Sequence, residues 1–412
     1  MHPNLVTYAV PVFFAAIVAE AIADRVRQKS AYRLGCAISD LDVGIASQVA
    51  DLFLKGLGLL AYAAVYRHRL VTLPEGSVWP WVVGLLGIDF LYYWWHRMSH
   101  VINVLWAVHA VHHQSEDMNF AVALRQPAFE ALTIIPFHLP LALLGVEPWI
   151  YVSCYAIDLI YQFWVHTEMT RRQASLEWIL NTPSAHRVHH GINPRYLDKN
   201  YGGILLVWDR LFGTYEPEVE PPVYGVTHPL SSYNPIWANF APFAEIARLV
   251  RQAPSGEKLG VLFAHPGRGG GPTRSVDRGT WTKYDPRSSG QVAGYVFAHF
   301  VLLALAGGAF LSLGEQLSVA SLLIPGAIIL ASTLALAAWT EGRRWVLAVD
   351  LARQAAAVAL VYAAVRFRTS SGVAAVAALG LAVVFAVLFA AFRPASAALP
   401  RSRPSRSTRS SP

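Results

Sequence analysis

The chain has 412 residues, of which 54% are hydrophobic and 14% are charged, and its mean hydropathy is +0.38. Soluble proteins carry about 25% charged residues, so this composition argues against a soluble enzyme and predicts an integral membrane protein. The net charge of +7 is not accompanied by an RNA- or DNA-binding pattern, so we expect no nucleic-acid partner.

Nine apolar stretches approach the roughly 20 residues that an α-helix needs to cross a hydrocarbon core. The sequence therefore predicts an all-α fold, a polytopic bundle of membrane helices. The first stretch is too long in its apolar part for a typical cleaved signal peptide and lacks a small-residue cleavage site. The predicted spans are 4–23, 42–64, 79–95, 128–145, 149–166, 291–311, 318–339, 345–365 and 372–392.

A polar segment separates the spans into two groups, which predicts three parts of the chain. Residues 1–290 form a membrane region that includes a polar cap over 171–290. Residues 291–395 form a C-terminal group of four transmembrane helices. Residues 396–412 are rich in Pro, Ser and Arg, which predicts a disordered basic tail.

Basic residues beside the spans predict the orientation of the chain, because cytoplasmic loops carry an excess of Lys and Arg. We predict that the loops after the first span, between the seventh and eighth, and after the last are cytoplasmic. Four arginines on the opposite side, Arg67, Arg69, Arg366 and Arg368, reduce this contrast. The basic residues of the predicted cytoplasmic loops are Arg25, Arg27, Lys29, Arg33, Arg343, Arg344, Arg393, Arg401, Arg403, Arg406 and Arg409.

Eight of the fifteen histidines lie in three compact clusters. On a helix, residues three or four positions apart share a face, so each cluster directs two imidazoles to one point. Adjacent histidines are turned by about 100° from each other, so the extra histidine of an HxxHH motif can bind a second ion. The clusters are HRMSH with His96 and His100, HAVHH with His109, His112 and His113, and HRVHH with His186, His189 and His190.

A single zinc ion takes about four ligands, so eight imidazoles are too many for one ion and fit two metal ions better. Imidazole binds iron, zinc, copper and nickel, so the ligand type alone does not choose the metal. The two cysteines, Cys36 and Cys154, lie far apart and support neither a disulfide framework nor a cysteine-ligated metal site. Helix capping or a headgroup location is the ordinary alternative, but ionisable groups at membrane depth are costly and usually have partners.

His166 is predicted as a ninth ligand. It ends the fifth span, where Asp158, Gln162 and His166 recur at four-residue spacing and form one polar stripe on an apolar helix. We expect ordinary structural roles for the isolated histidines, which are His2, His68, His138, His228, His265 and His299.

Three carboxylates are predicted to support the ligands. A metal-bound imidazole commonly donates its second N–H to a carboxylate or a carbonyl, which fixes its tautomer. Asp89 and Asp158 lie on the third and fifth spans, in line with the histidines that end those spans. Glu116 follows HAVHH by three residues. For Asp89 and Asp158, a helix–helix hydrogen bond without a metal is the alternative.

The predicted orientation brings all nine histidines to one face of the membrane, facing the cytoplasm. Acyl chains lie beside this face, which indicates a lipid substrate. Iron can activate O2 against an unactivated C–H bond, whereas zinc-bound hydroxide suits a cleavable ester, so a monooxygenase and a zinc-dependent hydrolase both stay open. A metal transporter or sensor is the non-enzymatic alternative, but clustering at one edge argues against permeation.

The order HxxxH, HxxHH, HxxHH resembles the fatty acid hydroxylase superfamily of membrane di-iron enzymes, which includes sterol desaturases and hydroxylases. Within it, the sequence is most similar to the alkylglycerol monooxygenase family and its bacterial relatives. The resemblance covers roughly residues 85–235. It rests on DFLYYWWHRMSH, LWAVHAVHHQSEDMNFAVALRQ, YQFWVHTEM, LNTPSAHRVHHGINPRYLDKNYGGILLVWDRLFGTYEPE and VYGVTHPL.

This resemblance implies two non-haem iron ions held by the eight clustered histidines. It also implies that O2 is split and that one oxygen atom enters a lipid C–H bond. In the alkylglycerol case, the carbon beside the ether oxygen is hydroxylated, the product collapses to a fatty aldehyde and glycerol, and tetrahydrobiopterin is the reductant. Hydroxylation or desaturation of a fatty acid, sterol or carotenoid is the alternative within the superfamily.

The sequence departs from the family pattern at Val101, where relatives often have a Glu directly after HxxxH. The role of that acid must be absent or supplied elsewhere, for example by Glu116 or Glu168. The sequence shows no cytochrome b5-like domain, flavin fingerprint or iron–sulfur motif, so we expect an external electron donor, a pterin or a redox protein. Candidates for placing substrate or reductant are Arg125, Gln126, Asn200 and Tyr201.

Overall fold

The computed structural model describes residues 5–268, 281–286, 288–314, 316–392 and 394. Within these residues the regular elements are helices, and the extended pairing is limited to two isolated bridges. The predicted all-α fold is therefore confirmed. The predicted tail, 396–412, lies outside the described residues.

The chain divides into two compact units. One comprises Met1–Asp285 with Leu311–Val319, and the other comprises Pro286–Phe310 with Ala320–Pro412. The helices of the first unit are α1 (Leu5–Arg27), α2 (Leu34–Tyr66), α3 (Trp79–Val101), α4 (Asn103–His113), α5 (Phe120–Ala123), α6 (Glu130–Leu143), α7 (Pro148–Val165), the 3₁₀ turn η1 (Leu176–Trp178), α8 (Pro183–His189), α9 (Val207–Leu211), α10 (Pro235–Gln252) and α11 (Lys258–Phe263).

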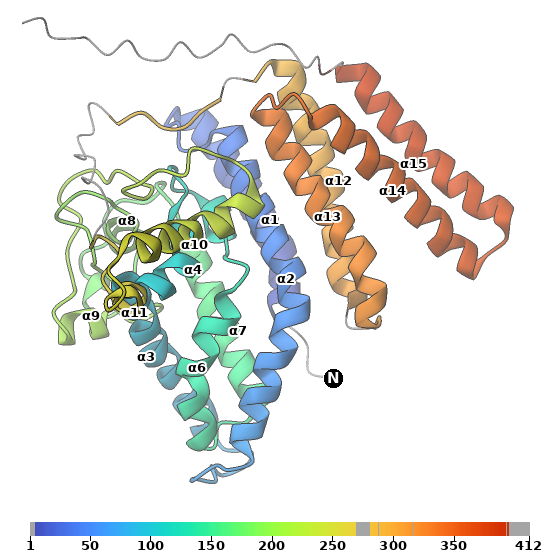
Figure 1. Ribbon diagram of the computed structural model, residues 1–412. Coiled ribbons are helices and arrows are strands. Elements are labelled where there is room, and N and C mark those ends of the chain that lie inside the picture. The colour runs from blue at the N-terminus through green and yellow to red at the C-terminus, as the bar shows by residue number, and fades with distance from the viewer. Residues whose placement is uncertain (1–4, 269–280, 287, 315, 393, 395–412) are drawn as a thin grey trace, which may run out of the picture. The chain divides into compact units, whose positions relative to one another are not determined.

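Within the first unit, α3 packs against α4, α6 and α7, and α7 also contacts α8. Figure 1 shows α3, α6 and α7 alongside one another, with α4, α8 and α10 gathered near one end of them. Small residues permit this packing. A Cβ on Gly84 would lie 2.9 Å from Cys154 Sγ, and one on Gly87 would lie 2.4 Å from Leu141 Cδ2. These two glycines therefore let α7 and α6 approach α3 closely.

Four helices in the described part of the chain are long and apolar enough to cross a membrane. They are α12 (Gly290–Gly314), α13 (Val319–Thr340), α14 (Val346–Arg368) and α15 (Ser371–Phe392). Together with the bent pair Leu34–Leu54 and Gly56–Tyr66 of α2, the number rises to five.

The predicted spans that lead to the histidines are helical as well, but they are less apolar than expected. α3 and α7 contain many Trp and Tyr residues together with ionisable side chains, which lower their hydropathy, and α6 has only 14 residues. The polar residues that the site needs therefore replace part of the apolar surface of these helices.

The second unit contains a buried polar cluster among its apolar helices. Asp350 accepts hydrogen bonds from Tyr295 Oη at 2.6 Å and Trp339 Nε1 at 2.9 Å, and pairs with Arg353 at 2.5 Å. Arg353 also donates to His299 Nδ1 at 3.1 Å. Since lipid offers no replacement partners, these contacts hold α12, α13 and α14 together.

We expect Asp350→Leu to lower the free energy of unfolding by about 3–5 kcal/mol, because Arg353 would keep a buried charge without its carboxylate partner. Tyr295→Phe keeps the ring but removes the hydroxyl that donates to Asp350 and accepts from Gln354 Nε2, so its expected cost is about 2 kcal/mol. Unfolding of the purified protein in detergent measures both. An Asp350→Leu protein as stable as the Tyr295→Phe protein would contradict this account.

Candidate metal centre

The structure brings all nine predicted histidines together in two groups of buried side chains. Within each group, one ring nitrogen of every histidine lies within 4.8 Å of the others. Site 1 denotes the group of His96, His100, His109, His113 and His189. Site 2 denotes the group of His112, His166, His186 and His190.

The two HxxHH motifs divide their histidines between the two sites. In α4, His109 and His113 are one helical turn apart and belong to site 1, whereas His112 belongs to site 2. In α8, His189 belongs to site 1, and the other two histidines of HRVHH belong to site 2. The step of about 100° per residue around a helix produces this division.

The histidines lie in the last turns of helices or directly after them. The histidines of HRMSH form the last turns of α3, and His166 is the residue that ends α7. The start of α8 is fixed by Thr182, whose hydroxyl accepts a hydrogen bond from Ala185 N at 3.3 Å, and by Pro183 in the first turn. The short helix α8 therefore begins at Pro183, and HRVHH contributes histidines to both sites.

Four of the five histidines of site 1 face one another through their Nε2 atoms. The Nε2 atom of His109 lies 2.9 Å from that of His96 and 3.1 Å from that of His113. The Nε2 atoms of His113 and His189 are 3.2 Å apart. Two nitrogen ligands about 2.1 Å from a metal ion, at right angles to each other, would be about 3.0 Å apart. The observed separations match that spacing.

Site 2 has the same arrangement. The Nε2 atom of His166 lies 3.1 Å from that of His112 and 2.9 Å from that of His186. The Nε2 atoms of His186 and His190 are 3.1 Å apart.

Backbone carbonyls fix the tautomers of four of these rings. At site 1, His96 Nδ1 lies 2.8 Å from Tyr201 O, and His189 Nδ1 lies 3.0 Å from Lys199 O. A carbonyl oxygen can only accept, so each Nδ1 carries the proton and each Nε2 carries a lone pair. At site 2, His112 Nδ1 donates to Arg125 O at 3.0 Å and His166 Nδ1 donates to Gln162 O at 2.7 Å.

The lone pairs of His112 and His166 therefore point at each other across 3.1 Å. Such an arrangement is repulsive unless a cation lies between the nitrogens. Metal-bound histidines characteristically donate their other ring N–H to a carbonyl or carboxylate, as these do. The residues present therefore fit a metal ion at site 2, and the matching geometry at site 1 fits a second one.

Burial also keeps the imidazoles in the form that binds metals. It lowers the pKa of His112 to about 4 and the pKa of His189 to about 3. At neutral pH both rings are uncharged, so no proton has to leave before a metal ion binds.

The predicted supporting carboxylates have other partners. Asp89 accepts hydrogen bonds from Ile204 N and Trp208 Nε1, both at 2.7 Å. Asp158 accepts one from Gln162 Nε2 at 2.6 Å. These two acids thus hold segments that carry the carbonyl acceptors, rather than the rings.

Glu116 accepts a hydrogen bond from Tyr284 N at 2.5 Å. The carboxylate that the structure does place near a ring is Asp198, whose Oδ1 lies 3.9 Å from His100 Nδ1. Asp198 Oδ2 also lies 3.1 Å from Nε2 of the exposed His265. Sequence reasoning missed Asp198 because it is 98 positions from His100 and no local spacing relates them.

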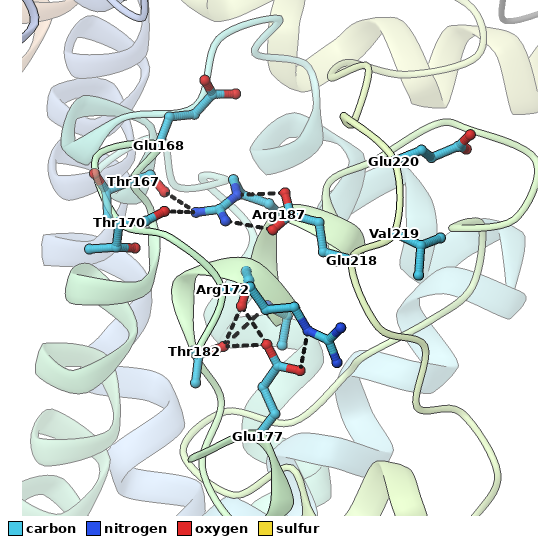
Figure 2. Close-up of polar contacts among 12 residues, drawn as sticks. Thr167, Glu168, Thr170, Arg172, Glu177, Thr182, Arg187, Glu218, Val219 and Glu220 are labelled. Carbon is cyan, nitrogen blue, oxygen red and sulfur yellow. Dashed lines mark hydrogen bonds and ion pairs between the residues drawn. The ribbon is translucent and has the colours of Figure 1, made fainter. Parts of the chain in front are cut away.

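Arg187 lies inside the HRVHH motif, and Figure 2 shows its guanidinium between Glu218 and the segment of Thr167 and Thr170. Its guanidinium pairs with Glu218 at 2.6 Å and donates to the carbonyl oxygens of Thr167 at 2.9 Å and Thr170 at 3.2 Å. Because Thr167 directly follows His166, Arg187 ties the end of α7 to α8. Sequence reasoning did not single out this residue, although its place between two ligands was a signal.

The comparisons with known proteins agree on one enzyme family. The fatty acid hydroxylase family profile matches residues 81–214. The chain is 38% identical over 310 residues to alkylglycerol monooxygenase of Xenopus tropicalis, which covers 73% of this chain and 69% of the relative. It is 41% identical over 275 residues to alkylglycerol monooxygenase of Homo sapiens, which covers 66% of this chain and 62% of the relative.

A more distant relative is ornithine lipid hydroxylase OlsE of Rhizobium tropici, 28% identical over 184 residues, with 43% of this chain and 55% of the relative covered. No solved structure gives a significant match. The family profile covers the three clustered motifs and His166, which are the residues that form both sites.

We expect Arg187→Met to lower the free energy of unfolding by about 3–5 kcal/mol, because it leaves Glu218 and two carbonyls without their cation. Arg195→Met is the matched control, since Arg195 forms an ion pair with Glu216 but is 55% exposed. Exposed pairs contribute less than about 1 kcal/mol. Equal losses of stability in the two variants, measured by thermal unfolding in detergent, would show that Arg187 is not an anchor.

Proposed function

The chain belongs to the fatty acid hydroxylase family, and from this premise we propose that it is a membrane-bound non-haem di-iron monooxygenase that hydroxylates a C–H bond of a lipid with O2. The observation that carries the proposal is the pair of buried histidine groups whose Nε2 lone pairs converge. The five histidines of site 1 would hold one iron and the four of site 2 the other. When bound, iron supplies the activation of O2 that a zinc ion lacks.

The residues around the sites would perform three tasks. The carbonyls of Tyr201, Lys199, Arg125 and Gln162 hold imidazole rings in the tautomer that presents Nε2. The burial of all nine histidines keeps bulk water away from the reacting atoms. We propose that apolar side chains of the same unit receive the acyl chain of the lipid.

We propose alkylglycerols as the first substrate class to test, because several relatives at 35–41% identity bear the name alkylglycerol monooxygenase. Hydroxylation beside the ether oxygen would then release a fatty aldehyde and glycerol. Fatty acid, sterol or carotenoid substrates are the alternative in the same family. We further propose that the sites face the cytoplasm, on the basis of the basic loops.

The electron donor is proposed to be external, either tetrahydrobiopterin or a redox protein. Val101 ends α3 at the position where relatives often have a Glu. Glu116 and Glu168, the two acids considered as substitutes, accept hydrogen bonds from Tyr284 N and Tyr224 Oη. Both carboxylates thus hold segments of the cap.

The purified protein is expected to contain about two iron ions, one for each histidine group. His109→Ala and His186→Ala should each lose iron and O2-dependent activity, while His228→Ala, which alters an exposed histidine outside both groups, should retain both. Metal analysis and O2 uptake give the readouts. Full activity without iron, or zinc-supported activity without O2, would overturn the monooxygenase in favour of a hydrolase.

The substrate class can be tested by lipid analysis of cells with the wild-type protein or with the inactive His186→Ala variant. For ether-lipid cleavage we expect alkylglycerols to accumulate with the variant, and isotopically labelled O2 to appear in the wild-type product. Unchanged alkylglycerols together with missing hydroxylated acyl chains, sterols or carotenoids would reassign the substrate within the family.

A further inference from the structure

The carbonyls that fix the rings of the two sites come from different parts of the chain. We propose that Asp209 and Arg125 are positioning residues, each for one metal site, so that either metal ion can be weakened without the other. This inference rests on the proposed di-metal function and adds to it the residues that support each ion separately.

Site 1 depends on residues 198–205, which we call the strap. The strap supplies Lys199 O to His189, Tyr201 O to His96 and the carboxylate of Asp198 near the third ring, that of His100. These acceptors lie within four consecutive residues, so one displacement of the strap would disturb three of the five histidines of site 1 together.

Asp209 holds the strap against site 1. Its Oδ1 accepts a hydrogen bond from Tyr201 N at 2.7 Å, and its Oδ2 accepts one from Gly202 N at 2.8 Å. Thr214 Oγ1 donates to Asp209 Oδ1 at 2.7 Å, and the Asp209 side chain is fully buried. A Cβ on Gly202 would lie 3.0 Å from Asp209 Oδ2 and 2.4 Å from Leu205 O, so this approach needs glycine.

The carboxylate therefore fixes the peptide group before Tyr201 and the peptide group that contains the Tyr201 carbonyl, which accepts from His96. Asp209 touches neither a histidine nor the place where a metal ion would lie, so it acts on site 1 through the strap. Asn181 assists, because its Nδ2 donates to the carbonyls of Gly202 at 2.7 Å and Gly203 at 3.2 Å.

Site 2 depends on a different residue, Arg125. Its carbonyl accepts the hydrogen bond from His112 Nδ1, while its side chain returns to the helix that carries His112. Arg125 Nε donates to Val111 O at 2.6 Å and Nη2 donates to Gln114 Oε1 at 2.8 Å. The Val111 carbonyl is in the last turn of α4, where carbonyls have no partner within the helix.

The Arg125 guanidinium is itself fixed by Asp40 of α2, at 3.1 Å, and both side chains are buried. Arg125 thus clamps the last turn of α4 and supplies the acceptor for His112 from the same residue. The hydrogen bonds of Arg125 hold α4 and α2, whereas those of Asp209 hold the strap and Thr214. We therefore expect separate effects on the two sites.

The test uses the full-length protein in detergent, stripped of metal and titrated with Fe(II) without O2. The wild type should bind two ions. Asp209→Ala should bind one ion about 10- to 100-fold more weakly and leave the other unchanged, as is typical when an outer partner of a ligand is lost. Arg125→Lys, which keeps the charge next to Asp40 but loses the fork of donors, should have the same effect on the other ion.

Double variants assign the ions. Adding Asp209→Ala to His186→Ala, which damages site 2, should leave both ions weakly bound. Adding it to His109→Ala, which already damages site 1, should leave the binding of the ion at site 2 unchanged. Arg125→Lys should show the reverse pattern. Electron paramagnetic resonance of the oxidised protein supplies an independent readout, because a single ferric ion gives a signal that a coupled pair suppresses.

Asp24→Ala is the matched control. Asp24 is also a buried Asp that accepts hydrogen bonds from two consecutive backbone N–H groups, those of Ala31 at 2.9 Å and Tyr32 at 3.3 Å. It should lower stability without a site-selective change in metal binding. If Asp209→Ala does not fold, Asp209→Asn, which keeps one acceptor oxygen, should show a smaller weakening of the same ion.

The outcomes separate this inference from the proposed function. A wild type that binds no metal would overturn the proposed function, and this inference with it. A wild type with two ions and variants that lose both ions equally, or neither, would overturn only the assignment of Asp209 and Arg125. Selective loss of a different ion in each variant would support it.

Discussion

The repulsion between converging imidazole lone pairs is the constraint on which the first unit depends. Eight of the nine buried rings face one another through nitrogens about 3 Å apart, and four of them have their other nitrogen committed to a carbonyl. The surrounding structure must therefore hold the rings in place until a cation relieves the repulsion. The burial that makes the imidazoles neutral also makes them available as ligands.

The rings are held by rigid hydrogen-bond acceptors, and these acceptors are backbone carbonyl oxygens. A backbone carbonyl has no side-chain rotamers, whereas a side-chain carboxylate can adopt several. The carbonyl therefore defines the orientation of the ring more narrowly. The acceptors are themselves held by buried side chains, with Asp209 at the strap, Arg125 at the end of α4 and Arg187 between α7 and α8. These three buried side chains thus serve the geometry of the two sites.

The membrane setting explains how polarity is distributed between the units. Helices α12–α15 are apolar over most of their length, and their buried charges, Asp350 and Arg353, lie in one cluster, whereas Arg366 and Arg368 are exposed at the end of α14. α3 and α7 carry aromatic and ionisable residues towards the histidines, and so fall below the hydropathy of ordinary spans. A site that needs polar side chains next to lipid reduces the apolar character of the helices that build it.

The sequence by itself predicted the all-α fold and the nine converging histidines, because spacing along a helix indicates which side chains share a face. The structure alone divides these histidines between two sites. The sequence did not determine what supports them. Asp89, Asp158 and Glu116 had suitable spacing, yet the acceptors on the rings are carbonyls, including Tyr201 O, 105 residues beyond His96. Only the tertiary structure brings such distant backbone atoms to a ring, since a carbonyl occurs at every residue and leaves no mark in the sequence.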